Sequence, residues 1–503
     1  MPAVAAKTTG QPGRVWLVVL TSLTTVFLVW CLDALFEFLP HRSPGIDIYG
    51  NRTLLHRVGT FAAAKSSDAA PVPGGASSGG KLSGSSGTFD GSGGTLNSSA
   101  AARYDNMTRC GVRIRRCRND WLHEYSRLHA DIAAGRAPPR WLVSVAVEAG
   151  LADRLTGMVT QLWLAVLSRR AIAALTYGDL PGFGAACDAP HFDWLQPPPG
   201  LPPDAVDPLK YTYRGVRGYG GDRSYPPTVN GSEYHPLYMI NAGDLKWMET
   251  TNLSRLPEKR PETPYVISSS NRGRSYAIAN NPYHKATFAE RGVPPDDAFM
   301  CGFFWLCWPN AAVQAYYQQF WEPLSDRAAL KIGLQIRTGD GVFRGEAVSD
   351  AAKAAALARG ASYFECAQGV EDLHKLPGQR VIWFINSDSV VLRIAAKEKY
   401  GDKVLTDTAL KMVHPDCKGQ NPGACGQSSM DASFQHSLGS MITFALVDYH
   451  VVTVDSGFGR LGSYMSGRWG NDYELRPGEK CDPKAPLPKS TTNNYFAGVR
   501  KRA

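Results

Sequence analysis

Three apolar runs in the C-terminal part of the chain have the composition of buried strands, and each ends abruptly in polar residues. The runs are Ile332–Ile336, Val381–Asn386 and His450–Val454. Helical patterns alternate with them, roughly at Ala351–Arg359, Val390–Lys399 and Ser433–Val447. This alternation predicts a sheet of parallel strands, in which the side chains that follow each strand meet in one crevice at the carboxyl edge.

A second α/β pattern precedes this one. Its expected elements are strands at Trp141–Val147, Ala171–Tyr177 and Tyr265–Ser268 and helices at Arg154–Arg170 and Asn310–Trp321. The Pro- and Gly-rich stretch from Pro181 to about Pro264 is expected to form irregular surface loops. The sequence therefore predicts an α/β protein with two Rossmann-type domains, residues 103–325 and 326–503, facing a ligand cleft.

The N-terminal segment has the pattern of a membrane anchor. Val15–Leu32 is an uncharged run of 18 residues, just long enough to cross a bilayer as a helix. Lys7 and Arg14 precede it and Asp33 follows it, which favours a cytosolic tail at residues 1–14 and a luminal remainder. A cleaved signal peptide is the alternative, but the run is long for one and has no clear small-residue cleavage site.

The segment between this anchor and the globular part, residues 33–102, is expected to be a flexible stem. In Pro73–Ala100, 17 of 28 residues are Gly or Ser, so the segment has little to bury. An anchor, a stem and a large luminal domain are typical of Golgi-resident modifying enzymes. Some membrane-tethered binding proteins share this arrangement.

Glycosylation and cysteine patterns agree with a luminal location. Five Asn-x-Ser/Thr sites occur, at Asn51, Asn97, Asn106, Asn230 and Asn252. Of ten cysteines, Cys31 lies in the anchor, and an oxidising compartment would pair most of the remaining nine, leaving at least one unpaired. Cys417 and Cys425 are candidates for a short bridge. No Cys-x-x-Cys occurs, so we expect no structural zinc site.

The charge balance suits anionic small substrates or an anionic surface, because 54 Lys and Arg against 45 Asp and Glu give a net charge of +9. No basic run with interleaved aromatic residues is present, so a nucleic-acid partner is not expected. The densest basic cluster, Arg113–Arg118, is predicted to be a solvated face.

Arg337 directly follows the first apolar run of the C-terminal part. Its planar guanidinium can bind an oxyanion through two parallel hydrogen bonds and stays charged. The alternative is that Arg337 and Asp340 form a surface pair that caps the strand.

The other two runs also end in groups that suit an anion. Asp388 follows the second run, and the turn Ser456–Gly459 follows the third run and precedes a helical pattern at Leu461–Met465. Such a turn presents backbone N–H groups at a helix N-terminus. The alternatives are a simple helix N-cap at Asp388 and an ordinary tight turn at Ser456. The convergence of the three strand ends on one edge favours a nucleotide-diphosphate site.

The segment Gly333–Asp340 resembles the arginine motif of the fucosyltransferases that use GDP-fucose and have the two-Rossmann GT-B fold. The resemblance is closest to the plant xyloglucan-type α-1,2-fucosyltransferases, which also have glutamine where α-1,6 and bacterial relatives have histidine; here it is Gln335. Further segments that resemble family motifs, in the same order, are Glu148–Arg154, Ser270–Gly273, Ala298–Phe304 and His436–Gly459.

This resemblance implies a GT-B-like fold in which the N-terminal domain binds the acceptor and the C-terminal domain the nucleotide sugar. The donor-binding residues that it implies are Gln335, Arg337, Asp388, Ser456, Gly457, Phe458, Gly459 and Arg154, with Asp388 at the guanine base. The sequence departs from the family at Ala152 and Asp153, where glycine and asparagine are usual, and residues 197–260 have no counterpart.

Sugar transfer from a nucleotide sugar places negative charge on the leaving diphosphate, which metal-dependent enzymes stabilise through an Asp-x-Asp pair. No Asp-x-Asp occurs in this chain, so we expect no metal and no cofactor, and the charge is left to arginine and backbone amides. A general base must also accept the proton of the acceptor hydroxyl. The candidates are Glu148, Asp340 and His436, and the sequence does not separate them.

The sequence thus predicts a metal-independent inverting glycosyltransferase of the Golgi membrane, single-pass with a luminal catalytic domain. It would transfer fucose from GDP-fucose to a hydroxyl of a cell-wall or glycoprotein glycan. The alternatives are transfer from another nucleotide sugar and, because of the altered turn at Ala152 and Asp153, a decayed transferase that remains as a membrane-tethered glycan-binding protein.

Overall fold

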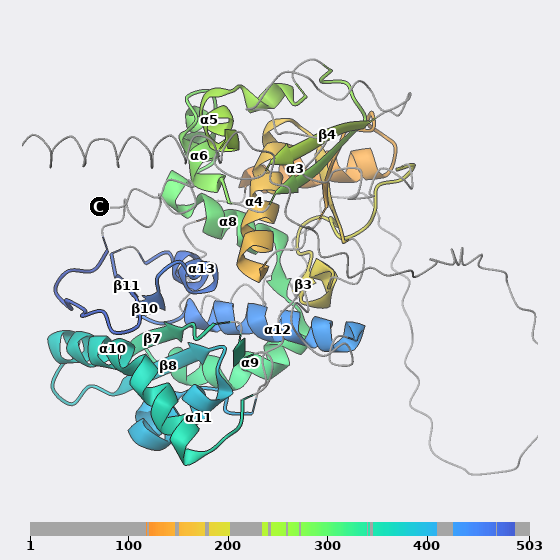
Figure 1. Ribbon diagram of the computed structural model, residues 1–503. Helices are drawn as coiled ribbons and strands as arrows, with labels where there is room; N and C mark the ends of the chain where they lie inside the picture. Colours follow the sequence, from red (N-terminus) through yellow and green to blue (C-terminus); the bar gives the residue numbers. More distant parts are fainter. Residues whose placement is uncertain are drawn as a thin grey trace, which may run out of the picture. The chain divides into compact units, whose positions relative to one another are not determined.

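A computed structural model divides the chain between Phe89 and Asp90. The residues that the structure describes all lie after this boundary: 117, 120–145, 150–176, 181–201, 234–239, 243–257, 260–270, 273–339, 341–342, 346–409, 426–468 and 470–487 (Figure 1). The expected anchor and stem lie outside these residues and remain predictions. Among the helices of the described part, none combines the length and apolar character that crossing a bilayer requires.

The first sheet has four parallel strands in the order β2-β1-β5-β4. The strands are β1 (Trp141–Val145), β2 (Ala171–Leu175), β4 (Tyr234–Met239) and β5 (Tyr265–Ser270). The three predicted strands are confirmed, but the prediction of irregular loops up to Pro264 is wrong at β4. That strand contains Pro236 and lies at the sheet edge, where a residue without an N–H is tolerated, so it lacks the apolar pattern of a central strand.

Helices cover both faces of this sheet. They are α3 (Asp120–Ala133), α4 (Leu151–Leu167), α5 (Gly243–Thr250), α6 (Ser275–Asn280), α7 (Lys285–Glu290) and α8 (Ala298–Leu306). Helix α9 (Ala311–Leu324) packs instead on the second half, where its Phe320 contacts Phe384. Along β1, Val143 packs in a cluster with Ile132 of α3, and Leu142 packs in the cluster that contains α4 and α8, so the strand is apolar on both sides. The short β3 (Cys187–Asp188) pairs with β6 (Trp308–Pro309).

The second sheet has five parallel strands in the order β11-β10-β7-β8-β9. The strands are β7 (Leu330–Ile336), β8 (Val381–Ser387), β9 (Val404–Leu405), β10 (Tyr449–Thr453) and β11 (Asp472–Leu475), and the helices are α10 (Asp350–His374), α11 (Val390–Tyr400), α12 (Gln427–Phe444) and α13 (Gly457–Ser466). The mixed α/β fold with parallel sheets is therefore confirmed.

Helix α10 is much longer than the sequence pattern predicted. It continues through Gly360 to His374 and spans 25 residues. A Cβ at Gly360 would lie 2.9 Å from Phe364 and 3.2 Å from Leu392 of α11, so the glycine allows the two helices to pack closely. Glycine disfavours helix interiors, but tertiary packing overrides that preference here, so the helix extends beyond the predicted Ala351–Arg359.

The connections of the second sheet reverse direction at β7. The chain runs from β7 to β8 and β9 on one side and then adds β10 and β11 on the other side. Helices α10 and α11 pack on one face, whereas α12 and α13 pack on the opposite face, where Gly333 of β7 leaves room for Phe444. The carboxyl ends of β7 and β10 thus form a topological switch point, where open α/β sheets bind their ligands.

One apolar cluster includes side chains from both halves, among them α4 and α8 of the first and α12 and α13 of the second. The crossing of α9 with α12 requires a glycine, because a Cβ at Gly439 would lie 2.1 Å from the Tyr317 ring. Figure 1 shows α12 lying beside α9.

Disulfides join segments that are distant in the sequence. Among the described residues there are three, Cys117–Cys301, Cys187–Cys307 and Cys366–Cys481. The predicted pairing of most cysteines is confirmed for these six. Cys417 and Cys425 lie outside the described residues, so their bridge remains a prediction.

Candidate functional site

Asp388 organises the carboxyl ends of β7 and β8. Its carboxylate is buried, with Oδ1 accepting hydrogen bonds from the backbone N–H and the hydroxyl of Thr338, both at 2.8 Å. Its Oδ2 accepts from the N–H of Gly339 at 3.2 Å and lies 2.9 Å from Nη1 of Arg337. Both oxygens therefore hold the turn that follows β7. The sequence resemblance implies that Asp388 contacts a guanine base. Such a base would have to bind carboxylate oxygens that already accept hydrogen bonds from this turn and pair with Arg337.

The simpler explanation of Asp388 as a helix N-cap does not describe its contacts, whereas the pair of Arg337 with Asp340 remains a prediction. The N-cap of α11 is Ser389, whose Oγ accepts from the N–H of Leu392 at 3.1 Å, and not Asp388. Arg337 pairs with Asp388, while Asp340 lies outside the described residues. Asp388 is thus a positioning residue for Arg337.

Arg337 is fixed at its backbone as well as at its side chain. Its N–H donates to Thr453 Oγ1 at 2.9 Å, and the same hydroxyl donates to the carbonyl of Gln335 at 3.1 Å. Thr453 therefore ties β10 to β7 at the switch point. The Arg337 side chain remains 32% exposed, so its guanidinium is oriented by the protein and still reaches solvent.

The N-terminus of α13 lies beside this arginine. Ser456 is its N-cap and accepts through Oγ from the N–H of Gly459 at 3.4 Å. A Cβ at Gly459 would lie 2.5 Å from Gln335 Oε1, so a larger residue at this position would have to displace the Gln335 side chain. Gln335 is buried beneath the turn and its Oε1 has no hydrogen-bond partner in the part of the chain that the structure describes.

Strain is concentrated just before α13. Asp455 has a φ of 63°, a left-handed conformation that is unusual for a residue with a side chain. Such backbone strain recurs at functional sites because it fixes the following residues in one arrangement. Here it directs the chain from the end of β10 into the Ser456–Gly459 turn.

An ion pair holds α13 against β11. Arg460, in the first turn of α13, contacts both carboxylate oxygens of Glu474.

Arg154 occupies a different environment, at the contact between the two halves. It lies in the first turn of α4, is 3% exposed, and its Cζ lies 5.4 Å from the Phe183 ring and 5.2 Å from the Phe434 ring of α12. Nη2 donates to the carbonyl of Pro181 at 2.5 Å, whereas Nε and Nη1 have no hydrogen-bond partner among the described residues. Burial lowers its pKa to about 10, so Arg154 stays charged at neutral pH.

Of the three candidate bases, only His436 lies among the residues that the structure describes, and Glu148 and Asp340 lie outside them. The His436 ring packs edge-on against Tyr316 of α9, with ring centroids 3.9 Å apart. Burial lowers the pKa of His436 below its usual value, against the opposing effect of Asp407, so the ring is neutral at pH 7. Its contacts with α9 place it in the packing between helices.

The structure brings together Gln335, Arg337, Asp388 and the turn Ser456, Gly457, Phe458 and Gly459 at one edge of the second sheet. Sequence reasoning missed Thr453, which it treated as part of a strand, although a hydroxyl residue at a strand end can bond the neighbouring chain. Chemically, this edge can bind an anion through one guanidinium and the amides of a helix N-terminus. Within the described ranges, no group of three His, Cys, Asp or Glu side chains is placed to hold a metal ion.

No protein-family model matches this sequence, and no curated protein matches it. The comparison with solved structures found similar chains at low sequence identity. A mutant of Arabidopsis thaliana FUT1 in complex with GDP is 15% identical, with 78% of this chain and 82% of that chain covered and a TM-score of 0.47. The fucosyltransferase NodZ from Bradyrhizobium is 12% identical (68% and 98% covered, TM-score 0.34). POFUT1 in complex with GDP is 11% identical (68% and 100% covered, TM-score 0.32).

Proposed function

We propose that this protein is a glycosyltransferase that uses a nucleotide diphosphate sugar. The observation that carries the proposal is Arg337, which Asp388 and Thr453 hold at the switch point of the second sheet, beside the N-terminus of α13. A diphosphate needs positive charge and hydrogen-bond donors in a fixed arrangement, and this edge supplies both.

In the proposed reaction, Arg337 and the backbone N–H groups of the Ser456–Gly459 turn stabilise the charge that develops on the leaving diphosphate. Asp388 does not touch the sugar and acts by holding Arg337. The acceptor hydroxyl attacks the sugar carbon from the opposite side in a single inverting displacement, and a base takes its proton. Glu148 and Asp340 remain the candidate bases in the segments that follow β1 and β7. His436 is a weaker candidate because it packs against α9.

We take GDP-fucose as the donor and a cell-wall or glycoprotein glycan as the acceptor. The donor rests on the sequence resemblance of the segment around Gln335 and Arg337 to the fucosyltransferase motif, and no metal is required because the chain lacks Asp-x-Asp. The three disulfides support a secretory-pathway protein. We therefore place the catalytic domain in the Golgi lumen, behind an anchor at residues 15–32.

A second candidate, a tethered glycan-binding protein without activity, is favoured by one observation. Arg154, which belongs to the segment that resembles the family's first motif, is buried against Phe183 and Phe434 in this structure. Such a protein would bind glycans and ignore nucleotides.

Incubation of the full-length protein with a panel of nucleotide sugars separates the two candidates. We expect release of GDP from GDP-fucose, slowly by hydrolysis and faster when an acceptor glycan is present, and no comparable release of UDP from UDP-sugars. If the protein prefers another nucleotide sugar, only the assignment of GDP-fucose as the donor is wrong. If it binds a glycan but neither binds nor consumes any nucleotide sugar, the proposed transferase activity is wrong.

A further inference from the structure

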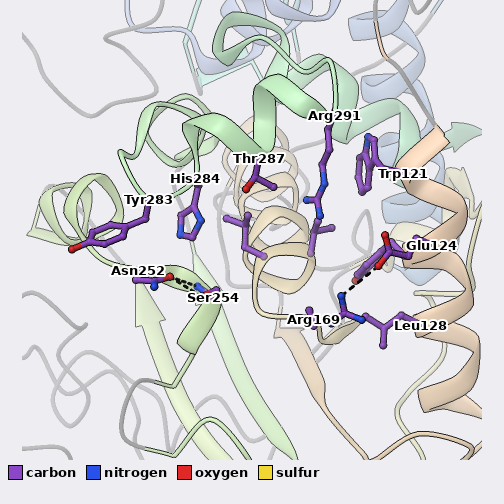
Figure 2. Close-up of a pocket in the computed structure, with 13 residues that line it drawn as sticks. Trp121, Glu124, Leu128, Arg169, Asn252, Ser254, Tyr283, His284, Thr287 and Arg291 are labelled. Carbon is purple, nitrogen blue, oxygen red and sulfur yellow. Dashed lines mark hydrogen bonds and ion pairs between the residues drawn. The ribbon is translucent and has the colours of Figure 1, made fainter.

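The first half contains a cavity that the proposed transfer site does not use. It has a volume of about 320 Å³ and lies between α3, the C-terminal end of α4, the turn η5 (Leu253–Arg255) and α7 (Figure 2). Arg154 lies at the start of α4 and Arg169 directly after its end, and at about 1.5 Å per residue the 17 residues of this helix span about 25 Å. The cavity and the contact region around Arg154 are thus at opposite ends of α4.

Buried polar groups fix the wall of this cavity. His284 accepts through Nε2 from the N–H of Leu253 at 2.8 Å and so joins the start of α7 to η5. The Asn281 amide donates to the carbonyls of Met248 and Thr251 at 2.6 and 2.8 Å. Both side chains are almost fully buried, at 4% and 0% exposed. The cavity is therefore bounded by a hydrogen-bonded framework.

Two arginines from different elements contribute positive charge to the cavity. Arg169 follows α4 in a left-handed conformation, with a φ of 53°, and pairs with Glu124 of α3 at 3.4 Å. Arg291 follows α7 and points into the cavity in Figure 2, with its Cζ 4.9 Å from the Trp121 ring. Its Nη1 is buried and has no hydrogen-bond partner in the described residues. Two carboxylates, Glu124 and Glu290, act on Arg291, and its buried Nη1 is still left as a donor for an anion.

The remaining lining suits a sugar. Asn252, Ser254 and Thr287 contribute amide and hydroxyl groups, and Glu124 can accept from a sugar hydroxyl. Tyr283, which is 59% exposed, offers an aromatic ring at the rim. A ligand pocket is expected to have a volume of roughly 300 Å³ or more, which this cavity reaches.

We propose that this cavity binds an acidic sugar residue, one that carries a carboxylate or a sulfate, in a glycan chain. Arg291 binds the acidic group, with Arg169 as the second cation. Burial lowers the pKa of Arg291, and Glu124 and Glu290 oppose this effect. The Arg291 cation is thus already partly removed from water, and a bound anion would stabilise its charge further. This binding site does not depend on the proposed transfer reaction.

The chain itself offers a rival occupant. Asn252 is the acceptor of an Asn-x-Ser pattern at the cavity rim, and its Oδ1 accepts from the N–H and the hydroxyl of Ser254 at 3.1 and 2.7 Å. A glycan attached to Asn252 would lie at the entrance of the cavity. The test therefore includes Asn252→Gln, which cannot carry this glycan.

The test is saturation-transfer NMR and titration of the full-length protein with glucuronic acid, glucose and inorganic sulfate. We expect glucuronic acid to bind at least about tenfold more tightly than glucose, because a charge-assisted hydrogen bond is gained. Arg291→Gln and Arg169→Asn should each weaken this binding about tenfold. Asparagine tolerates the left-handed backbone at position 169, so that variant should keep the fold even if Arg291→Gln loses packing on Trp121.

Arg136→Gln is the matched control, because Arg136 also forms an exposed ion pair, with Asp131, but lies outside the cavity. It should bind glucuronic acid like the wild type. Equal binding of glucose and glucuronic acid, or wild-type affinity in folded Arg169→Asn and Arg291→Gln, would overturn the proposal. If inorganic sulfate binds as tightly as glucuronic acid, the cavity is a simple oxyanion site and the proposal that it binds a sugar is contradicted. Binding that appears only in Asn252→Gln would show that the chain's own glycan is the occupant.

Discussion

Asp388 has no direct role in the proposed chemistry, yet the position of Arg337 depends on it. Its two oxygens accept from Thr338, Gly339 and Arg337, so a single carboxylate sets both the turn and the guanidinium. This arrangement resembles the way other active sites hold a reacting group through a second residue.

Asp388→Asn is expected to lower turnover at least about tenfold, because charge-assisted hydrogen bonds contribute about 1.5–3 kcal/mol and the asparagine amide would also face the N–H donors of the turn. The melting temperature should fall only slightly. Asp350→Asn is the matched control, since Asp350 is fully exposed and pairs only weakly with Lys353. Unchanged kinetics in Asp388→Asn would show that Arg337 is positioned without it.

Gly459 offers a second test at this scale. A methyl group there would lie 2.5 Å from Gln335 Oε1 and 3.1 Å from Val452, so Gly459→Ala should destabilise the protein by about 1–3 kcal/mol and reduce activity. Gln335→Ala removes the atoms that clash. The double variant should therefore recover part of the lost stability, measured by denaturant unfolding as a double-mutant cycle. If the losses of stability in the two single variants simply add up in the double variant, the cost of Gly459→Ala does not come from contact with Gln335.

At the scale of elements, the sequence predicted the central strands well and the edges poorly. β1, β7 and β8 are buried at every residue and mostly apolar, because both faces are covered, so their sequence pattern is easily recognised. β4 and β11 lie at sheet edges and contain proline or charged residues, so no local pattern marks them.

The sequence likewise predicted some residues of the candidate site and could not predict the role of others. The sequence predicted Arg337 and the Ser456 turn, since both follow recognisable strands. It could not choose between an N-cap and a site role for Asp388, because that choice depends on which backbone groups its oxygens meet across 50 residues of sequence. The role of Thr453 depends on the pairing of β10 with β7, which no local signal specifies.

The wall between η5 and α7 makes stability depend on pH. Burial lowers the pKa of His284 to about 4, with a further contribution from Arg291, whereas an unfolded histidine has a pKa of about 6.5. The unfolded state therefore binds more protons between these values, so the stabilisation is complete above pH 6.5 and is lost as the pH falls towards 4. His284→Gln keeps a hydrogen-bond acceptor for the N–H of Leu253 but does not titrate. Between pH 7 and pH 5, the free energy of unfolding, measured with denaturant, should therefore fall less in this variant than in the wild type. An equal fall in both proteins would show that His284 is not the source of the pH dependence.

At the scale of the whole molecule, the account predicts a reaction that proceeds without a metal ion. The positive charge at the β7 edge comes from Arg337 and the amides of α13, and the sequence has no Asp-x-Asp pair to bind a cation. Transfer from GDP-fucose should therefore persist in EDTA at an unchanged rate. Complete loss of activity under chelation, restored by manganese, would contradict metal independence while leaving the donor assignment intact.

The central claim is that Arg337 stabilises the leaving diphosphate, and its removal tests this most directly. Single-turnover measurements with GDP-fucose on Arg337→Ala should show a rate about two to three orders of magnitude below the wild type, the usual effect of one transition-state donor. Arg337→Lys should remain severely impaired because lysine lacks the planar fork, and GDP should bind both variants more weakly. Arg476→Ala, at an exposed position, should react normally. Normal turnover and GDP binding in a folded Arg337→Ala would contradict the account.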